Sequence, residues 1–554
     1  MNLQTQLKNL TLEILNKIIK ESNFESDSEI KINDFFIGET KIPDNLNLEK
    51  KFYHFSSNAA LVNAKNFKTN PLNLANKMKT YLEESNLIKE VLVTSPGFLN
   101  FIFNDQVLID IVNLINQQGT NYLKDSAEHK LKINDEFVSV NPTGFLHFGH
   151  ARGAIYADTL NNFLIHAGHD LIREYYVNDA GNQIDIVSQS TYLRYLELFG
   201  KEITLPEESY KGEDIIEFAK VIKDKYHDKF LNQKDDFYTD PEFKNLVTEI
   251  ALNEIKKDMH LFNIKHDLFF SEKTLYGKPI EDAMAKIKKH TYEKDGALFL
   301  KTTAFGDDKD RVLIKKDGTF TYFLPDIAYH NKKFQNVDKL IAYWGADHGG
   351  YVKRVKIAID ILGYDSSNYD IEIIQLVRLI KDGAEFKMSK RAGTGLFLRE
   401  MLNYSTVDAL RWYMIARDLN TKMDFDLNKA NEASQDNPVY SVQYAYVRTV
   451  SLLEKATLKN VTSSQLTNDK ERQLIMFLNE FKNIFDLIVR TYKVNLIIPY
   501  LIDLKNAFNA FYAEEKIIDS DNQISKLALV KATQTILKLS FGLIGISSPN
   551  KMQK

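Results

Sequence analysis

The stretch of residues 136–177 limits the possible folds of this chain more than any other part of its sequence. Residues 136–140, EFVSV, have the character of a short buried strand. Apolar spacing over 147–166 predicts a helix that ends at Gly168, and 170–177, DLIREYYV, predict a second strand. Strand, helix and strand in this order form the unit of a doubly wound parallel sheet. We therefore predict a Rossmann-like α/β domain.

Two histidines flank a glycine at the point where the first strand passes into the helix. The carboxyl ends of strands in open α/β sheets bind ligands, and the free N–H groups of a helix start favour phosphate. His147 and His150 share one face of the first helical turn, and Gly149 between them lets a flat group approach the backbone. We predict a nucleotide triphosphate site here, with Thr143 and Gly144 in the preceding turn. Considered alone, such a histidine pair more often caps or packs.

A basic loop, EFKMSKRAGTG at 385–395, follows an apolar strand-like stretch. The loop carries three cationic side chains, those of Lys387, Lys390 and Arg391, and its glycines permit movement. Ammonium groups that close over a phosphoryl group stabilise the charge that develops during its transfer. Taken alone, such a run is usually a solvated surface.

The composition excludes several classes of protein. The chain has 554 residues, too many for one core, and a formal net charge of −4, which argues against a wholly basic nucleic-acid wrapper. It contains no cysteine, so disulfides, thiolate zinc sites and cysteine nucleophiles are excluded. The amphipathic start is not a signal peptide, and no long apolar run is present. We expect a cytoplasmic protein that does not interact with membranes.

Changes in pattern along the chain predict several domains. The expected fold class is multidomain α/β: an α+β N-terminal domain, a parallel-sheet catalytic domain with a helical insertion, and an all-α bundle. Within the first domain, EVLVTSPGFLNFIFND predicts a hairpin. The expected boundaries are 1–118 for the N-terminal domain, 125–400 for the catalytic domain with its insertion at about 186–310, 401–430 for a connecting helical region, and 431–554 for the bundle.

Together the motifs resemble one enzyme family. HFGH is similar to the HIGH motif and KMSK reproduces the second motif of class I aminoacyl-tRNA synthetases. REYYVNDAGNQI, TYFLPDIAYH, GADHGG, DALRWYMIARD and NPVYSVQYAYVR occur in the order of the arginyl-tRNA synthetases, and the resemblance covers roughly residues 136–448. Phe148 departs from the usual branched aliphatic residue and is expected to face the core.

The resemblance implies a site for each small substrate. It assigns arginine to Glu136, Asn141, Tyr322, Asp326 and Gln183, with Asn178 and Asp179 as further lining residues whose roles could be largely structural. A guanidinium is planar, always charged and carries five donors, so a pocket with carboxylates suits it. The ATP site would comprise Thr143, Gly144, His147, Gly149, His150, Gly345, Asp347, His348, Met388, Ser389 and Lys390. His147, His150, Lys387 and Lys390 would be catalytic.

The resemblance also implies two-step attachment of arginine to its tRNA through an arginyl-adenylate. ATP would enter with Mg²⁺, and no zinc, resident metal or tightly bound cofactor is expected. Asn58 in the N-terminal domain and Tyr440, Gln443, Tyr444 and Arg448 near the bundle are the candidate tRNA-binding residues. The family expectation is a monomer that requires tRNA before it activates arginine.

Two other functions remain open at this point. One is a class I-like nucleotidyltransferase, although such chains are usually shorter and lack a helical C-terminal domain. The other is a catalytically silent RNA-binding paralogue, against which the intact HFGH and KMSK motifs argue.

Overall fold

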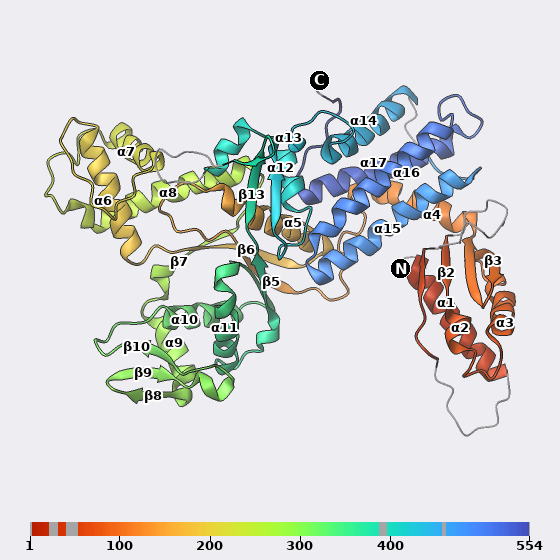
Figure 1. Ribbon diagram of the computed structural model, residues 1–554, viewed down its shortest axis with the longest axis horizontal. Helices are drawn as coiled ribbons and strands as arrows, with labels where there is room; N and C mark the ends of the chain where they lie inside the picture. The colour runs from red at the N-terminus through yellow and green to blue at the C-terminus, as the bar shows by residue number, and fades with distance from the viewer. Residues whose placement is uncertain (1–2, 22–31, 40–53, 387–395, 457–460, 553–554) are drawn as a thin grey trace.

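A computed structural model describes residues 3–21, 32–39, 54–386, 396–456 and 461–552 (Figure 1). Its centre is a five-stranded sheet in which every neighbouring pair is parallel. The strands, in spatial order, are β12 (Tyr369–Ile374), β11 (Lys339–Gly345), β5 (Lys132–Glu136), β6 (Asp170–Val177) and β7 (Leu268–Ser271). The predicted Rossmann-like parallel sheet is confirmed.

The first strand–helix–strand unit matches its prediction except at the end of β5. Helix α5 (Ala151–Ala167) follows a short 3₁₀ turn and ends at Gly168, whose φ of 102° is left-handed. The strand expected at 136–140 instead ends at Glu136. Val138 and Ser139 have φ angles of 69° and 44°, which an extended strand excludes. Glu136 is therefore the last strand residue and lies at the sheet's carboxyl edge.

The helical insertion expected at about 186–310 is present, but it is shorter than predicted and a second lobe follows it. Helices α6 (Asn182–Glu197), α7 (Glu213–Tyr226) and α8 (Pro241–Leu261) form one lobe, but β7 then returns to the central sheet. A second lobe contains α9 (Lys278–Ile287), α10 (Phe323–Phe334), α11 (Gly349–Ile361) and the antiparallel strands β8 (Thr291–Lys294), β9 (Ala297–Leu300) and β10 (Arg311–Ile314). These four-residue strands are too short to show a period of two among charged neighbours.

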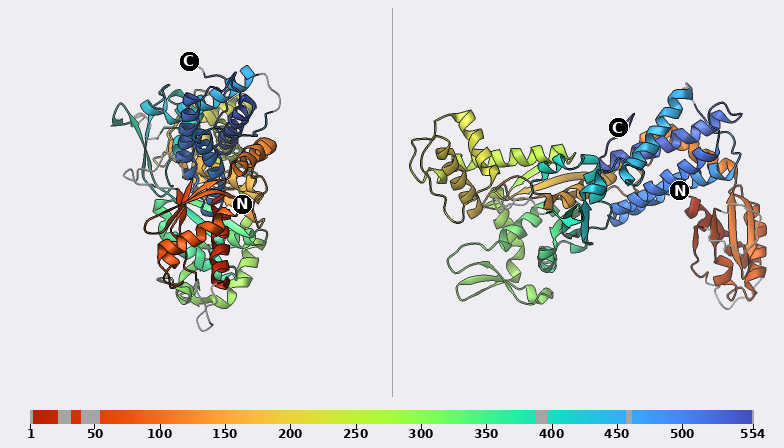
Figure 2. Two further views of the ribbon diagram at one scale, coloured as in Figure 1. Left: turned by 90° about the vertical axis from the view of Figure 1, so that its right-hand side faces the viewer. Right: turned by 45° about the horizontal axis from the view of Figure 1, so that its top comes forward.

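The N-terminal unit is a four-stranded antiparallel sheet covered by helices. Its sheet order is β1 (Ile37–Glu39), β2 (Phe55–Ser57), β4 (Phe98–Phe103) and β3 (Ile88–Thr94), and its helices are α1 (Leu3–Glu21), α2 (Ala59–Asn63) and α3 (Pro71–Glu83). The β3–β4 hairpin confirms the predicted turn at Pro96–Gly97. The unit projects from one end of the molecule (Figure 2).

Helix α4 (Asp105–Gln118) packs against the C-terminal helices α15 (Asp469–Thr491) and α17 (Gln523–Ile544), not against the N-terminal sheet. Asp105 at its start forms an ion pair with Arg472 at 2.8 Å. Asn116 donates to the backbone oxygen of Ala528 at 2.8 Å. The N-terminal unit therefore ends before α4, earlier than the expected boundary at 118.

The C-terminal region is helical, as predicted, with one exception. Its helices are α12 (Val407–Met414), α13 (Leu427–Ala430), α14 (Pro438–Ala456), α15, α16 (Ile497–Glu514) and α17. The exception is β15 (Met423–Asp426), which pairs with β13 (Val377–Lys381), itself paired with β14 (Ala384–Glu385). The expected helical connection at 401–430 thus contributes a strand to a small sheet.

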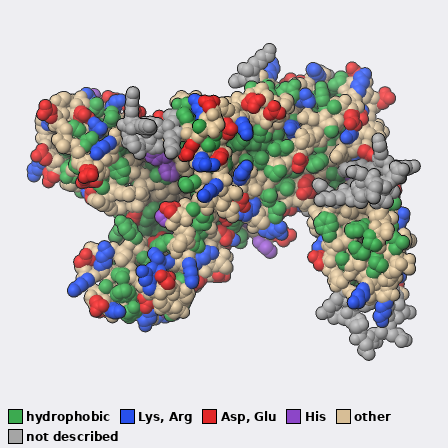
Figure 3. Space-filling view, in the orientation of Figure 1, with side chains coloured by type: hydrophobic (Ala, Val, Ile, Leu, Met, Phe, Trp, Pro, Cys, Tyr) green, Lys and Arg blue, Asp and Glu red, His purple; other side chains and the backbone are tan. Residues whose placement is uncertain are grey.

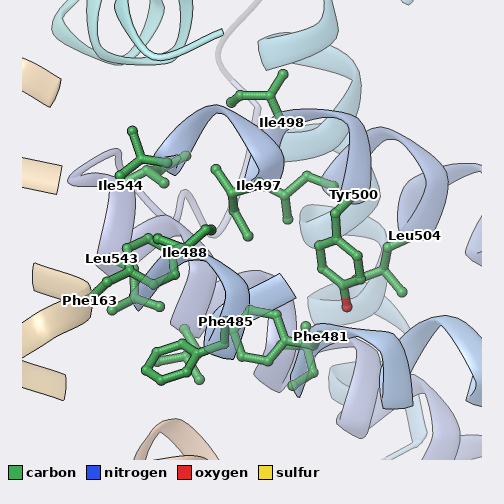
Figure 4. Packing of buried hydrophobic residues seen from close by; sticks show 14 of the residues in the cluster. Phe163, Phe481, Phe485, Ile488, Ile497, Ile498, Tyr500, Leu504, Leu543 and Ile544 are labelled. Atoms are coloured by element: carbon green, nitrogen blue, oxygen red, sulfur yellow. The ribbon is translucent and has the colours of Figure 1, made fainter. Parts of the chain in front are cut away.

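Helix α5 joins the catalytic domain to the bundle. Phe163 from α5 reaches into the apolar interior between α15, α16 and α17, where its ring centroid lies 5.5 Å from that of Phe485 (Figure 4). Within the described residues, α17 alone is long and apolar enough to cross a membrane, but 72% of its most apolar window is buried inside the protein. In this structure, α17 forms part of the core.

Candidate active site

The central sheet reverses its strand order between β11 and β5. β5 is followed along the chain by β6 on one side, and β11 later adds on the other side. Such a reversal leaves a crevice at the carboxyl ends of the strands. A cavity of about 480 Å³ lies there, lined by Val138, Gly149, His150, Gly153, Tyr343, Gly345, Asp347 and Ile374, among others. In the space-filling view, histidine side chains lie in a recess between the two lobes (Figure 3).

The two histidines of HFGH are adjacent and oriented differently. Their ring centroids are 5.9 Å apart, and the His147 ring stacks on Phe397 at 5.2 Å. The backbone N–H of His147 donates to Nδ1 of His150 at 3.1 Å. Burial, with a smaller contribution from His147, lowers the pKa of His150 to about 4. His150 is therefore neutral near pH 7, and its proton lies on Nε2, which can donate to a phosphate oxygen.

Three glycines lie near the histidines, and the space available for a side chain differs at each of them. Among the residues that the structure describes, none places an atom within 4 Å of a Cβ on Gly149, so the space beside it is open to them. A Cβ on Gly153 would lie 2.4 Å from Cδ1 of Ile374. A Cβ on Gly144 would collide with the carboxylate of Asp214, which accepts from the backbone N–H of Phe145 at 3.3 Å. Gly149 thus leaves room for a ligand, whereas the other two allow close packing.

The chain that leaves the KMSK motif lies directly against HFGH. The backbone N–H of Phe148 donates to Leu396 at 2.8 Å, and that of Leu398 donates to Leu146 at 2.6 Å. Lys387, Met388, Ser389 and Lys390 lie outside the described residues, so their predicted roles stay predictions. The contacts of Leu396 and Leu398 hold the described segment that follows the second motif against HFGH. Phe148 is buried, as expected.

A second cavity of about 340 Å³ lies beside the histidines. It is lined by Val140, Asn141, Thr143, Gly144, Phe145, His147, Tyr210, Lys211, Gly212 and Asp214. Asn141 Nδ2 donates to Gln183 Oε1, so these two predicted arginine-site residues are in contact. Thr143 and Gly144 line this cavity instead of the larger one at the strand reversal. Asp179 accepts from Ser271 and from the backbone of Lys273, which makes its role structural.

Glu136 belongs to a buried cluster of charges. Lys333 Nζ lies 2.9 Å from Glu136 Oε2 and 3.7 Å from Glu174 Oε1. The Tyr329 hydroxyl donates to both carboxylates. Burial acts to raise the pKa of Glu136, but the charge of Lys333 and the hydrogen bonds from Lys333 and Tyr329 outweigh it and lower this pKa. Glu136 is therefore held as a carboxylate at the end of β5.

Asp326 lies one turn from this cluster on the same helix, α10. Its carboxylate accepts from the Tyr351 hydroxyl at 2.9 Å and lies 3.2 Å from Nδ1 of His330. Its side chain is 26% exposed, so it is neither sealed nor turned into bulk water. Since residues 326, 329, 330 and 333 share one helix face, Asp326 and the partners of Glu136 face the same region.

The structure does not bring Tyr322 to Asp326 as predicted. Tyr322 precedes the first residue of α10 and is 90% exposed. The backbone at Tyr322 is helical, with φ −56° and ψ −24°, and its oxygen accepts from the N–H of Asp326 at 3.3 Å. The pair fails to meet because the phenol of Tyr322 extends into solvent. The phenol that binds Asp326 comes instead from Tyr351 on α11.

Tyr176, which sequence reasoning missed, lies among three carboxylates. Burial raises its pKa, and the negative charges of Glu272, Asp326 and Glu136 raise it further. Its ring centroid lies 4.8 Å from that of Tyr329. Glu272 directly follows β7 as Glu136 ends β5, so the carboxyl edge of the sheet collects these acids. Position at strand ends was the signal that could have identified Tyr176 and Glu272.

Among the predicted ATP residues on the β11 side, Gly345 and Asp347 line the cavity of about 480 Å³. His348 lies 3.4 Å from Asp347, and both side chains are largely exposed. Within the described ranges, no group of three or more His, Asp or Glu side chains is arranged to hold a metal ion.

The predicted RNA-binding residues differ in their availability. Tyr440 and Tyr444 stack at 6.3 Å on α14, and the guanidinium of Arg448 lies 4.9 Å from the Tyr444 ring centroid. Gln443 is only 8% exposed, and its amide donates to Asp408 and Ser547. Gln443 therefore fixes the C-terminal segment, which corrects its assignment as an RNA contact. Asn58 accepts from the backbone of Phe36 at 2.8 Å.

Three family models match successive parts of the chain. The model of the class I (R) tRNA synthetase catalytic domain covers residues 110–447. The arginyl tRNA synthetase N-terminal domain covers 5–103, and the DALR anticodon binding domain covers 442–552. The chain belongs to the arginyl-tRNA synthetase family. The fold class expected from the sequence is therefore confirmed.

Individual relatives agree with this family assignment. A protein of Metamycoplasma arthritidis named arginine–tRNA ligase is 43% identical over 522 residues, 93% of this chain and 96% of the relative. A Bacillus subtilis protein with the same name is 38% identical over an alignment of 571 residues, which covers 100% of this chain and 100% of the relative.

Solved structures are similar as well. A Campylobacter jejuni chain described as an arginyl tRNA synthetase has a TM-score of 0.75 at 33% identity, covering 80% of this chain and 100% of that one. The Thermus thermophilus arginyl-tRNA synthetase, at 18% identity, has a TM-score of 0.71 over 99% of this chain and 100% of its own, which supports the fold alone.

Proposed function

We propose that this chain attaches L-arginine to tRNA(Arg) at the expense of ATP. The observation that carries the proposal is a set of carboxylates, Glu136, Asp326 and Glu272, gathered around Tyr176 at the sheet edge that also bears the histidine pair. A substrate with an ammonium and a guanidinium group matches such a pocket. ATP fits the adjacent cavity beside Gly149.

In the first step, an oxygen of the arginine carboxylate attacks the α-phosphorus of ATP and pyrophosphate leaves. The neutral His150 donates Nε2–H to a phosphate oxygen, and His147, Lys387 and Lys390 assist in stabilising the charge that develops. Mg²⁺ enters with ATP and supplies charge neutralisation on the phosphates. The protein provides position and electrostatics, and needs no nucleophile of its own.

In the second step, the terminal ribose 2′-hydroxyl of the tRNA attacks the acyl carbon of arginyl-adenylate and AMP leaves. Glu136 would bind the substrate's ammonium group with help from Asn141 and Gln183, and Asp326 would bind the guanidinium. Tyr351 orients Asp326 through the hydrogen bond from its hydroxyl. Because a site built to bind a fixed cation rejects analogues that lack it by about 10⁴-fold or more, no editing step is needed.

The tRNA would contact both ends of the molecule. The half-buried stack of Tyr440 and Tyr444 with Arg448 suits unpaired bases, which proteins commonly recognise by stacking. The N-terminal unit with Asn58 would contact the tRNA elbow. We further propose that the protein acts as a cytoplasmic monomer without a zinc site or tightly bound cofactor.

ATP–pyrophosphate exchange with each amino acid, with and without tRNA, tests the proposal. We expect exchange with arginine alone, and only when tRNA is present. Exchange without any amino acid would indicate a different nucleotidyltransferase. No exchange at all, with RNA binding intact, would indicate a silent RNA-binding paralogue.

A further inference from the structure

A carboxylate from the first lobe lies between the two signature segments. Asp258, on α8, has a fully buried side chain. Its Oδ2 accepts from the backbone N–H of Leu146, directly before HFGH, at 3.2 Å. Its Oδ1 accepts from Nε of Arg399, which follows the KMSK loop, at 2.6 Å. One carboxylate therefore binds both segments.

Arg399 is fixed in its plane by further contacts. Nη1 donates to Glu254 Oε2 at 2.9 Å, and Nη2 donates to the backbone oxygen of Glu254 at 3.2 Å. The guanidinium carbon lies 3.8 Å from the centroid of the Phe145 ring. Planar, forked donors are required for this set of bonds, and a lysine ammonium cannot reproduce it. We call Asp258, Arg399 and Glu254 the clasp.

The clasp acts on the histidines through the aromatic side chains beside it. Phe145, under Arg399, packs edge-on against Phe397 at 5.2 Å. Phe397 stacks on His147, also at 5.2 Å. None of the clasp residues lines either of the two cavities beside the histidines. The clasp can therefore affect chemistry only by setting the position of other groups.

We propose that Asp258 and Arg399 are positioning residues for arginine activation, holding residues 396–399 against 145–148. The proposal rests on the proposed function. The clasp holds the described segment 396–399, which follows the KMSK motif in the chain, beside HFGH. It also fixes the ring of His147. The first lobe thereby participates in catalysis although it contains no proposed catalytic residue.

The test compares Arg399→Lys, Asp258→Asn and the variant that carries both substitutions with a control variant, Lys220→Met. Lys220, on α7 of the same lobe, is the control because it forms an exposed ion pair at 2.7 Å with Glu217, which is not a clasp residue. The measurements are kcat and KM for arginine and ATP in tRNA-dependent pyrophosphate exchange, and the Tm of each variant, with kinetics run well below it. Arg399→Lys retains the charge and carries the test if Asp258→Asn does not fold.

We expect kcat to fall roughly tenfold to a hundredfold in each single variant, with KM for arginine unchanged, because small misplacements slow phosphoryl chemistry. The double variant should be little worse than the more affected single variant, since both break one linkage. Lys220→Met should match the wild type. The proposal would be overturned if folded single variants kept the wild-type kcat. It would also be overturned if the loss of kcat in the double variant equalled the product of the losses in the two single variants. A wild-type chain without arginine-dependent exchange would instead overturn the proposed function.

Discussion

At the scale of single residues, each charged group in the amino-acid pocket is held by a partner from another element. Lys333 on α10 pairs with Glu136 on β5, and Tyr351 on α11 binds Asp326 on α10. Held side chains lose little freedom when a substrate binds, so their hydrogen bonds contribute more fully to affinity. These partners are as important to test as the acids themselves.

Replacing Asp326 by Asn should raise KM for arginine at least about thirtyfold, since losing one partner of a charge pair costs about 2 kcal/mol or more. KM for ATP should not change. Tyr351→Phe should raise KM for arginine less, and Tyr322→Phe should leave it unchanged because that phenol is exposed. Steady-state kinetics distinguish these cases. A larger effect from Tyr322→Phe would restore the pairing expected from the sequence.

Lys333→Met should make arginine binding depend on pH. Burial raises the pKa of Glu136, and without the charge and hydrogen bond of Lys333 this effect is no longer outweighed, so the pKa rises above its ordinary value. As the pH falls, the protonated fraction then grows and binding of the ammonium group weakens. KM for arginine should rise as the pH falls in this variant and stay level in the wild type. A level profile in both would exclude this role.

The low pKa of His150 also predicts a pH profile. The folded pKa is about 4, below the ordinary 6.5, so between these values the unfolded chain binds a proton that the folded chain does not. The contribution to stability is complete above pH 6.5 and is lost as the pH falls toward 4. The free energy of unfolding should therefore increase with pH between about 4 and 6.5. We expect the slope of this increase, measured by urea unfolding from pH 4 to 7, to be smaller in His150→Asn. An unchanged slope would contradict the burial of His150.

At the scale of elements, long periodic segments were predictable from the sequence and short ones were not. The helix beginning near His147, the hairpin around Pro96 and the C-terminal helices all followed from apolar periodicity. β7 and β15, with four residues each, were missed because so few residues cannot show a pattern. Tyr351 and Lys333 were missed because packing of α10 against α11 and β5 brings them to the site.

Gly149→Ala tests whether the space beside HFGH belongs to ATP. The new methyl group meets no atom of the described part of the chain, and the residue has no left-handed φ, so Tm should not fall. KM for ATP should rise because the methyl group occupies the cavity. Gly153→Ala is the contrast, since its methyl group would press on Ile374 and lower Tm. Thermal unfolding and ATP kinetics separate the two, and an unaltered KM for ATP in Gly149→Ala would place the nucleotide elsewhere.

At the scale of the whole molecule, the catalytic domain and the bundle share one core. Arg411, fully buried on α12, donates to Asp158 on α5 and to the backbone oxygens of Phe262 and Ile544. Its contacts thus join α5, the end of α8 and the end of α17. The fold class predicted for the chain is correct. The hydrophobic pattern of a sequence cannot, however, show which surfaces of one domain are covered by another domain.

Arg411→Met should lower the free energy of unfolding by about 3–5 kcal/mol, because Asp158 would be left as an unpaired buried charge. Arg378→Met, which breaks the exposed pair with Asp424, should have little effect. Urea denaturation measures both. Equal losses of unfolding free energy in the two variants would mean that the buried Arg411–Asp158 pair stabilises the fold no more than the exposed Arg378–Asp424 pair.

Helix α5 begins beside the HFGH histidines, and its middle packs against α15 and α17, where the Phe163 ring centroid lies 5.5 Å from that of Phe485. A fragment truncated before α14 would leave that flank of α5 bare, a large apolar face open to water. Such a fragment would aggregate before it could be assayed. The C-terminal helices are therefore required to keep the candidate active site soluble and folded, whatever they contribute to binding RNA.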